Sequence, residues 1–260
     1  MATYLDRILE RHRELAAADD RPLDELIALA RSLPAPRGFA DALRADGPLH
    51  VISEIKRRSP SKGDLNIDLD PAAMAATYER GGASCLSVLT DVEFFGGSVA
   101  DLQAARAACA LPVIRKDFTV SLRDVCDTRI MGADAVLLIA AALTRDELVE
   151  MHALAVSIGL DVLVEIHDER ELESALAADA TLIGVNQRDL VTFEVDHERA
   201  VRMARTIPDH AVKVAESGVR GADDAAALRA AGYDAVLVGE TLVTSADPAD
   251  AIRLLRRALP

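Results

Sequence analysis

From residue 50 onward, two hydrophobic patterns alternate along the chain. Short β-branched apolar runs, which are typical of buried strands, are each followed by an alanine-rich segment with helical periodicity. The apolar runs are nearly continuous, which indicates strands buried on both faces, as in a parallel sheet. Eight strands are predicted, at residues 51–56, 84–90, 112–116, 135–139, 161–166, 182–186, 212–216 and 235–239.

Eight helices are predicted to follow these strands, and several begin at a recognisable cap. Ser98 and Thr144 precede helical periodicity, and Pro248 follows Asp247 at a first helical position. Eight strand–helix units predict an α/β fold, a single (β/α)8 TIM barrel, for which about 250 residues is a common length. A doubly wound open sheet remains the alternative. The predicted helices are residues 72–80, 99–108, 121–131, 144–158, 169–178, 196–206, 221–230 and 248–258.

Residues 1–48 do not fit the repeat. Two amphipathic segments begin near Tyr4 and Leu23, and Pro34, Pro36 and Gly38 then break the chain. We interpret this part as an N-terminal helical extension that packs across one end of the barrel, within a single domain of residues 1–260. A partner-binding arm is the alternative.

Composition and charge limit the possible partners. The chain has 260 residues, of which half are hydrophobic, and its 29 Lys and Arg against 43 Asp and Glu give a net charge of −14. This balance argues against binding to nucleic acid or to an anionic membrane, but not against a small anionic substrate, because a local cluster of cations can outweigh distant charges. No apolar run approaches the roughly 20 residues of a membrane span, and acidic residues interrupt the first 18 positions. We therefore expect a soluble, cytoplasmic protein.

Neither the cysteines nor the histidines predict a metal site. Cys85, Cys109 and Cys126 are odd in number and form no CxxC pair, so we expect buried, reduced thiols. The six histidines show no ligand spacing and are interpreted as structural: His12, His50, His152, His167, His197 and His210.

Charged residues end the predicted strands, at the edge where barrel enzymes carry their active sites. Glu54 and Lys56 are two positions apart, so both point to the same side of the sheet. Buried charges at such positions are costly unless they pair or face water. The alternating signs from five strands indicate a site in which neighbours tune one another's pKa, although a ring of salt bridges that closes the barrel is the alternative. The set comprises Glu54, Lys56, Lys116, Glu165, Arg188 and Glu216.

Glycines in the last two loops indicate a phosphate site. Gly218 follows the seventh predicted strand and Gly239 ends the eighth. Glycine lets backbone N–H groups approach an anion, and these two loops frequently bind phosphate in barrels. Ordinary turn glycines are the alternative.

Several motifs resemble those of indole-3-glycerol phosphate synthases, in the expected order and over most of the chain. The run EIKRRSPSKG at residues 54–63 is similar to that family's signature, and RKDF at 115–118 supports it. The likeness continues through TDVEFFGGS at 90–98, GVNQRDL at 184–190 and AESGV at 215–219.

The resemblance implies a carboxy-lyase of tryptophan biosynthesis. Its substrate would be 1-(2-carboxyphenylamino)-1-deoxyribulose 5-phosphate, and ring closure, decarboxylation and dehydration would give indole-3-glycerol phosphate. No cofactor or metal is implied, and a monomer is expected. Two alternatives remain: a phosphate-binding barrel isomerase of the tryptophan or histidine pathways, and a catalytically inactive barrel that binds a partner.

The resemblance also implies catalytic roles for individual residues. Lys116 resembles the general acid of ring closure, and Glu165 the base and proton relay of dehydration. Lys56 resembles the residue that meets the substrate carboxylate and donates a proton as hydroxide leaves; which lysine acts in which step stays open. Glu54 and Glu216 would stabilise a cationic intermediate, and Asn186 and Ser217 would orient groups by hydrogen bonds.

The remaining implied residues would hold the substrate. Backbone N–H groups of Gly218, Gly239 and Glu240, helped by Lys56, would bind phosphate. Residues 56–63, which include Ser59, would form a mobile lid over the substrate. Some members of the family have an aromatic residue in the N-terminal helix that helps cover the substrate. In this sequence only Tyr4 or Leu5 could take its place. Arg188 would meet the anthranilate carboxylate or the lid, and the apolar walls, or ordinary core, would be Phe95, Phe118, Leu137 and Leu190.

Overall fold

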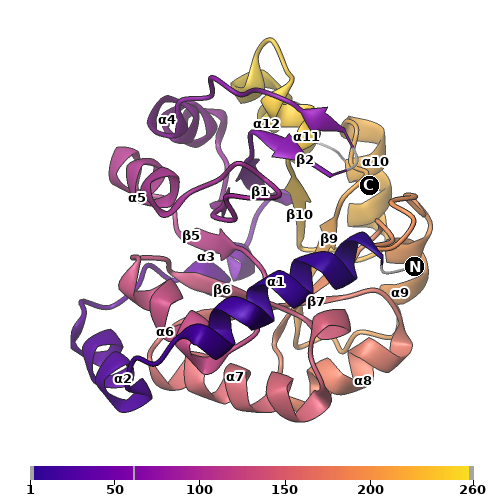
Figure 1. The fold of residues 1–260 in the computed structure, drawn as a ribbon. Coiled ribbons are helices and arrows are strands. Elements are labelled where there is room, and N and C mark those ends of the chain that lie inside the picture. Colours follow the sequence, from indigo (N-terminus) through magenta and orange to yellow (C-terminus); the bar gives the residue numbers. More distant parts are fainter. Residues whose placement is uncertain (1–2, 61, 258–260) are drawn as a thin grey trace.

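Eight parallel strands close into a barrel in the computed structural model, which describes residues 3–60 and 62–257 (Figure 1). The strands pair in the order β1-β10-β9-β8-β7-β6-β5-β4, and β1 also pairs with β4. The barrel prediction is confirmed, and the closure excludes the open sheet. The strands are β1 (His50–Ile55), β4 (Cys85–Leu89), β5 (Val113–Lys116), β6 (Ala135–Ile139), β7 (Asp161–Ile166), β8 (Leu182–Asn186), β9 (Val212–Glu216) and β10 (Ala235–Val238).

Each strand except the last is joined to the next by a helix on the outside of the barrel, and α12 follows β10 (Figure 1). The predicted caps are present: the hydroxyls of Ser98 and Thr144 accept from the third helical N–H, and Asp247 caps the last helix. The helices are α4 (Pro71–Gly81), α5 (Val99–Ala108), α6 (Leu122–Ile130), α7 (Arg145–Ser157), α8 (Glu169–Ala177), α9 (Arg199–Met203), α10 (Ala222–Ala230) and α12 (Pro248–Arg256).

Short elements and one shortened helix depart from the predicted pattern. Helix α9 covers only part of the predicted 196–206, and the chain before it folds back through a bridge between Arg188 and Val195. The predicted lid, residues 56–63, overlaps a small hairpin formed by β2 (Arg58–Ser59) and β3 (Gly63–Asp64). Ser61 of this segment and residue 258 of the last predicted helix lie outside the described residues. The other short elements are η1 (Ala140–Ala142) and α11 (Glu240–Val243).

Successive residues of a strand pack into two separate layers of the core, which explains why the apolar runs are continuous. In β6, Leu137 and Ile139 point into the barrel, where they pack with Ile52, Ile114 and Leu163. The intervening residues, such as Leu138, pack between the strands and the helices. Burial on both faces is what a parallel barrel strand requires.

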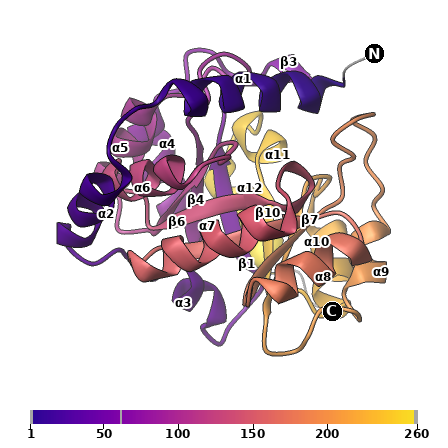
Figure 2. The ribbon, with the colours of Figure 1, turned by 60° about the horizontal axis from the view of Figure 1, so that its bottom comes forward.

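The N-terminal extension covers both ends of the barrel, not one end as predicted. Helix α1 (Tyr4–Ala18) lies over the carboxyl ends of the strands, α2 (Leu23–Ser32) packs on α6, and α3 (Phe39–Arg44) closes the opposite end (Figure 2). Phe39 and Leu43 are buried with the apolar residues inside the barrel. Just before α3, the Arg37 backbone N–H donates to Asp134, which immediately precedes β6.

Two further expectations concern thiols and membranes. Cys85 and Cys126 are buried free thiols, whereas Cys109 is only half-buried, because it lies at the end of α5 and its thiol contacts the Ala105 carbonyl oxygen. Among residues 3–60 and 62–257, no helix combines the length and the apolar character needed to cross a bilayer.

Candidate active site

A cavity of about 790 Å³ opens at the carboxyl ends of the strands, beneath α1. Every residue predicted for the site lines it, although the sequence scatters them over nearly 190 positions. The barrel brings together Glu54, Lys56, Ser59, Phe95, Lys116, Phe118, Leu137, Glu165, Asn186, Arg188, Leu190, Glu216, Ser217, Gly218, Gly239 and Glu240.

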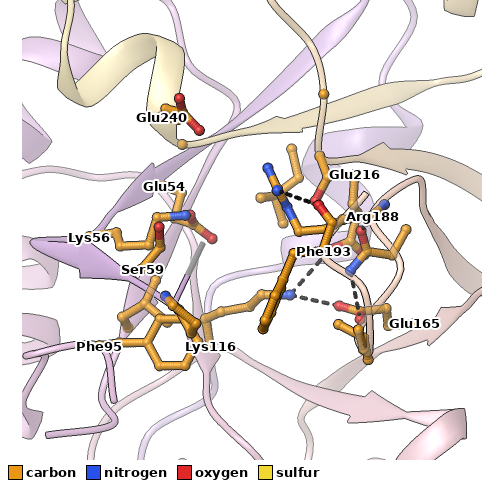
Figure 3. A pocket seen from close by; sticks show the side chains of 18 of the residues that line it. Glu54, Lys56, Ser59, Phe95, Lys116, Glu165, Arg188, Phe193, Glu216 and Glu240 are labelled. Atoms are coloured by element: carbon orange, nitrogen blue, oxygen red, sulfur yellow. Dashed lines mark hydrogen bonds and ion pairs between the residues drawn. The ribbon is translucent and has the colours of Figure 1, made fainter. Parts of the chain in front are cut away.

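The Lys116 ammonium lies between two buried carboxylates (Figure 3). Its Nζ is 2.7 Å from Glu165 Oε2 and 3.2 Å from Glu216 Oε2. These three side chains come from β5, β7 and β9, alternate strands that point inward at the same level. One cation is thus shared by two carboxylates in a nearly water-free environment, since the carboxylate side chains are only 1% and 2% exposed.

This arrangement shifts the three pKa values in different directions. Burial would lower the pKa of Lys116, but the charges of Glu165, Glu216 and Glu54 outweigh it and raise the pKa above its usual range. Burial would raise the pKa of Glu165, but Lys116, His167 and the Asn186 hydrogen bond lower it. Burial and the charge of Glu165 raise the pKa of Glu216 to about 7, despite Lys116. A single ammonium therefore keeps only one of its two partners firmly ionised.

A second ion pair and two glycines complete the charged part of the site. Lys56 Nζ lies 2.5 Å from Glu54 Oε1. A Cβ at Gly239 would overlap that carboxylate oxygen, and a Cβ at Gly184 would overlap Oε1 of Glu216. These glycines leave the space that the two carboxylates occupy, a steric role in addition to the phosphate role expected of Gly239.

The loop after β8 positions the partner of Glu165. Asn186 Nδ2 donates to Glu165 Oε1 at 2.9 Å, and Asn186 Oδ1 accepts from the Arg188 backbone N–H at 3.0 Å. Arg188 in turn donates to the Phe193 carbonyl at 3.1 Å. Phe193 has φ of 61°, a left-handed backbone that is costly for a non-glycine residue and is typical of functional loops. Sequence reasoning missed Phe193, whose only signal is an aromatic residue in a polar loop.

The candidate phosphate end lies at the last two strands. Ser217 and Gly218 have φ of 65° and 73°, so the chain turns sharply after β9, and α11 begins directly after Gly239. In the part of the chain that the structure describes, the N–H groups of Gly218 and Glu240 donate no hydrogen bond in a turn, loop or cap. The Glu240 carboxylate lies 3.5 Å from Lys62 Nζ, so its charge is partly neutralised by the lid.

Aromatic and aliphatic side chains line the other side of the cavity. The rings of Phe95 and Phe118 lie 6.2 Å apart, and Leu137 and Leu190 line the same cavity. Helix α1 contributes Tyr4, whose ring meets Phe193 edge-on at 5.5 Å. Tyr4 therefore places an aromatic ring of the N-terminal helix at the cavity, and its contact with the substrate stays a prediction; Leu5 and Ile8 also line the cavity.

His12 joins α1 to the barrel beside these aromatic walls. Its Nε2 lies 3.1 Å from Asp91 Oδ2 and 3.7 Å from Asp117 Oδ1, and its ring packs 5.6 Å from that of Phe118. The three groups are close enough to share a cation. Other oxygens of the pair are already engaged, because Arg115 donates to Asp117 Oδ2 and two backbone N–H groups donate to Asp91 Oδ1. The geometry fits a protonated His12 that fastens α1.

The closed barrel and the paired lysine and glutamate side chains in the cavity at its carboxyl end are typical of a TIM-barrel enzyme. The profile of one family, Indole-3-glycerol phosphate synthase, matches residues 5–255. The chain belongs to this family, whose members are carboxy-lyases of tryptophan biosynthesis that act on a phosphorylated small molecule.

Solved structures that resemble the chain share its fold at low sequence identity. Thiamine phosphate pyrophosphorylase from Pyrococcus furiosus is 15% identical with a TM-score of 0.58, over 81% of this chain and 94% of that one. (S)-3-O-geranylgeranylglyceryl phosphate synthase from Thermoplasma acidophilum, solved with sn-glycerol-1-phosphate, is 16% identical with a TM-score of 0.58, over 87% and 99%. These likenesses support the barrel.

Replacing Gly184 with alanine is expected to displace Glu216 and slow turnover. The new Cβ would overlap Oε1 of that buried carboxylate and press on Leu163, so the contact with Lys116 would lengthen. We expect kcat of the family's reaction to fall about tenfold or more, since small displacements of reacting groups are costly. Gly47→Ala is the matched control, because its Cβ would meet open space. Equal kcat in both variants would contradict the steric account.

The attachment of α1 is expected to weaken as the pH rises. Burial would lower the pKa of His12, but the Asp91 hydrogen bond and the charges of Asp117 and Asp91 raise it above its usual 6.5. A raised pKa contributes stability that is fully present below 6.5 and is lost as pH rises through the folded value. The unfolding free energy of the wild type minus that of His12→Gln should therefore shrink between about pH 6 and pH 9. A difference that grows over this range would refute the assignment.

Proposed function

We propose that this protein is an indole-3-glycerol phosphate synthase that converts 1-(2-carboxyphenylamino)-1-deoxyribulose 5-phosphate to indole-3-glycerol phosphate, carbon dioxide and water. One observation carries the proposal: the Lys116 ammonium is held between Glu165 and Glu216 in the cavity at the carboxyl ends of the strands. Membership of the family supports the same reaction. The cavity, at about 790 Å³, is of the size that binds ligands of this kind.

Ring closure needs an acid at the sugar carbonyl. In the proposed step the ring carbon attacks the carbonyl carbon, a carbon–carbon bond forms, and Lys116 gives a proton from Nζ to the carbonyl oxygen. The nitrogen keeps the electron pair of the broken N–H bond. Glu54 and Glu216 stabilise the cationic product of closure, and carbon dioxide then leaves with its bonding electrons returning to the ring system. An acid acts only within hydrogen-bond reach of its target, so the position of Lys116 matters more than its pKa.

Dehydration then forms the double bond that completes the five-membered ring of the indole. Glu165, whose low pKa keeps it ionised, takes a proton from the carbon next to the hydroxyl-bearing carbon. Lys56 gives a proton to the departing hydroxyl, which leaves as water. Asn186 supports this step by its hydrogen bond to Glu165, which fixes the orientation of the carboxylate.

Substrate binding is divided between the two sides of the cavity. The phosphate is proposed to meet N–H groups of Gly218, Gly239 and Glu240, with Lys56 adding positive charge. The carboxyphenyl ring packs among Phe95, Phe118, Leu137 and Leu190, and Ser59 and Arg188 contact its polar substituents. Tyr4 and Phe193 add to the apolar side.

Lys116→Ala is expected to lower turnover by about two decades or more, as for a lost general acid. The measurement is the fluorescence of the indole product formed from the carboxyphenylamino sugar phosphate, with a chelator present. Lys213→Ala is the control for loss of a buried lysine, because Lys213 is 8% exposed on β9 and donates to the Ala204 carbonyl, away from the cavity.

The outcomes separate the roles clearly. Loss of turnover in Lys116→Ala with a folded protein, and near-normal kcat in Lys213→Ala, supports the assignment. Near-normal kcat in Lys116→Ala removes that residue from its role. A wild-type protein that consumes no substrate and forms no indole contradicts the proposed function as a whole.

A further inference from the structure

His167 contacts the proposed base from outside the cavity. It follows β7 two residues after Glu165 and, of the residues that the structure describes, is not among those lining the cavity. Its Nε2 lies 3.9 Å from Glu165 Oε1, the oxygen that also accepts from Asn186. A side chain in this place acts on Glu165, not on the substrate.

The hydrogen bonds of the ring determine where its first proton lies. His167 Nδ1 is 3.0 Å from Glu171 Oε2, and the His167 backbone N–H donates to the same oxygen at 2.7 Å. Glu171 lies in the first turn of α8, where Asp168 caps the helix and accepts the Glu171 N–H. A carboxylate oxygen accepts hydrogen bonds, so Nδ1 carries a hydrogen.

The second ring nitrogen faces an acidic neighbour without a hydrogen-bond partner. Nε2 of His167 is buried and makes no hydrogen bond within the described residues. In a neutral ring with hydrogen on Nδ1, Nε2 would direct a lone pair toward Glu165, which leaves a buried acceptor unsatisfied beside an anion. In the imidazolium form Nε2 carries N–H and faces Oε1 with the opposite charge. The attraction between this N–H and a carboxylate oxygen 3.9 Å away favours the charged form.

The charged groups around the His167 ring also favour its imidazolium form. Burial lowers the pKa of His167, and so does the Arg199 guanidinium of α9, which donates to the Asn186 carbonyl. The Glu171 hydrogen bond and the charges of Glu165 and Glu171 raise the pKa, and they outweigh both. Lys116 contacts Oε2 of Glu165, whereas His167 faces the other oxygen of that carboxylate, Oε1.

We infer that His167 is a positioning residue whose imidazolium is a second cation for Glu165 and keeps this carboxylate ionised when Lys116 has given up its proton. This inference rests on the proposed function. When the Lys116 N–H bond breaks and the substrate O–H bond forms, the ammonium beside Glu165 becomes a neutral amine. Glu165 must still be a carboxylate to accept a proton in the dehydration. Without a second positive charge, a buried carboxylate beside Glu216 would capture a proton too early.

The first test examines the resting protein and needs no activity. The protein is labelled with ¹⁵N-histidine, and His167→Gln identifies the His167 signals by their loss. Near about pH 7, where an ordinary histidine is mostly neutral, both ring nitrogens of His167 are expected to be protonated. A neutral ring with hydrogen on Nδ1 alone at that pH would overturn the inference, whatever the enzyme's activity.

The second test separates a charge role from a packing role. Glutamine can place an amide near Nε2 without a charge, so His167→Gln is expected to leave KM within about twofold and to move the acid limb of the kcat–pH profile upward by about one unit. On that limb the shift appears as a rate about tenfold lower at fixed pH. His152→Gln is the control, because His152 is buried to a similar degree in α7, away from the cavity.

Three results would overturn or redirect the inference. An unmoved acid limb in His167→Gln, or an equal loss of kcat at every pH, would contradict the charge role. A wild-type enzyme without activity on the proposed substrate would refute the proposed function, while the ¹⁵N spectrum would still decide whether His167 is a cation facing Glu165.

Discussion

The site depends on one buried ammonium shared by two buried carboxylates. Two carboxylates this close, and almost fully removed from water, would be strongly unfavourable together without a cation between them. Lys116 supplies that cation from β5, and its contacts to Glu165 and Glu216 fix the relative positions of β7 and β9 side chains at the mouth. The two carboxylates share this positive charge, but His167 and Asn186 lower the pKa of Glu165 alone, whereas burial and the charge of Glu165 raise the pKa of Glu216. This difference supports the separate roles proposed for them.

The fold meets this requirement with small, specific adjustments. Alternate strands bring the three side chains to one level, and glycines at 184 and 239 leave room for the carboxylates of Glu216 and Glu54. The extension contributes at both ends: α3 fills the barrel opposite the site, while α1 adds Tyr4 to the cavity and is fastened through His12. The cavity is therefore covered by the same N-terminal segment that closes the opposite end of the barrel.

Much of this architecture follows from local sequence pattern. Continuous apolar runs and charged strand ends predicted eight strands and a ring of inward charges, and a closed barrel turned that pattern into one cavity. The pattern could not predict the path of the extension, because amphipathicity shows which face is buried but not against which partner. The left-handed Phe193 and the packing of Gly184 under Glu216 depend on contacts between distant strands and loops, and these appear only in three dimensions.

Titration of the two central carboxylates is the most direct test of the charge that they share with Lys116. Glutamate labelled with ¹³C at the side-chain carboxyl can be followed by NMR over the acid and neutral range, with Glu165→Gln and Glu216→Gln assigning the signals. We expect Glu216 to titrate at about 7, whereas Glu165 should stay ionised well below the ordinary value of 4.5. If both carboxyls titrated near 4.5, the environment around Lys116 would not separate their pKa values, and this interpretation of the site would be wrong.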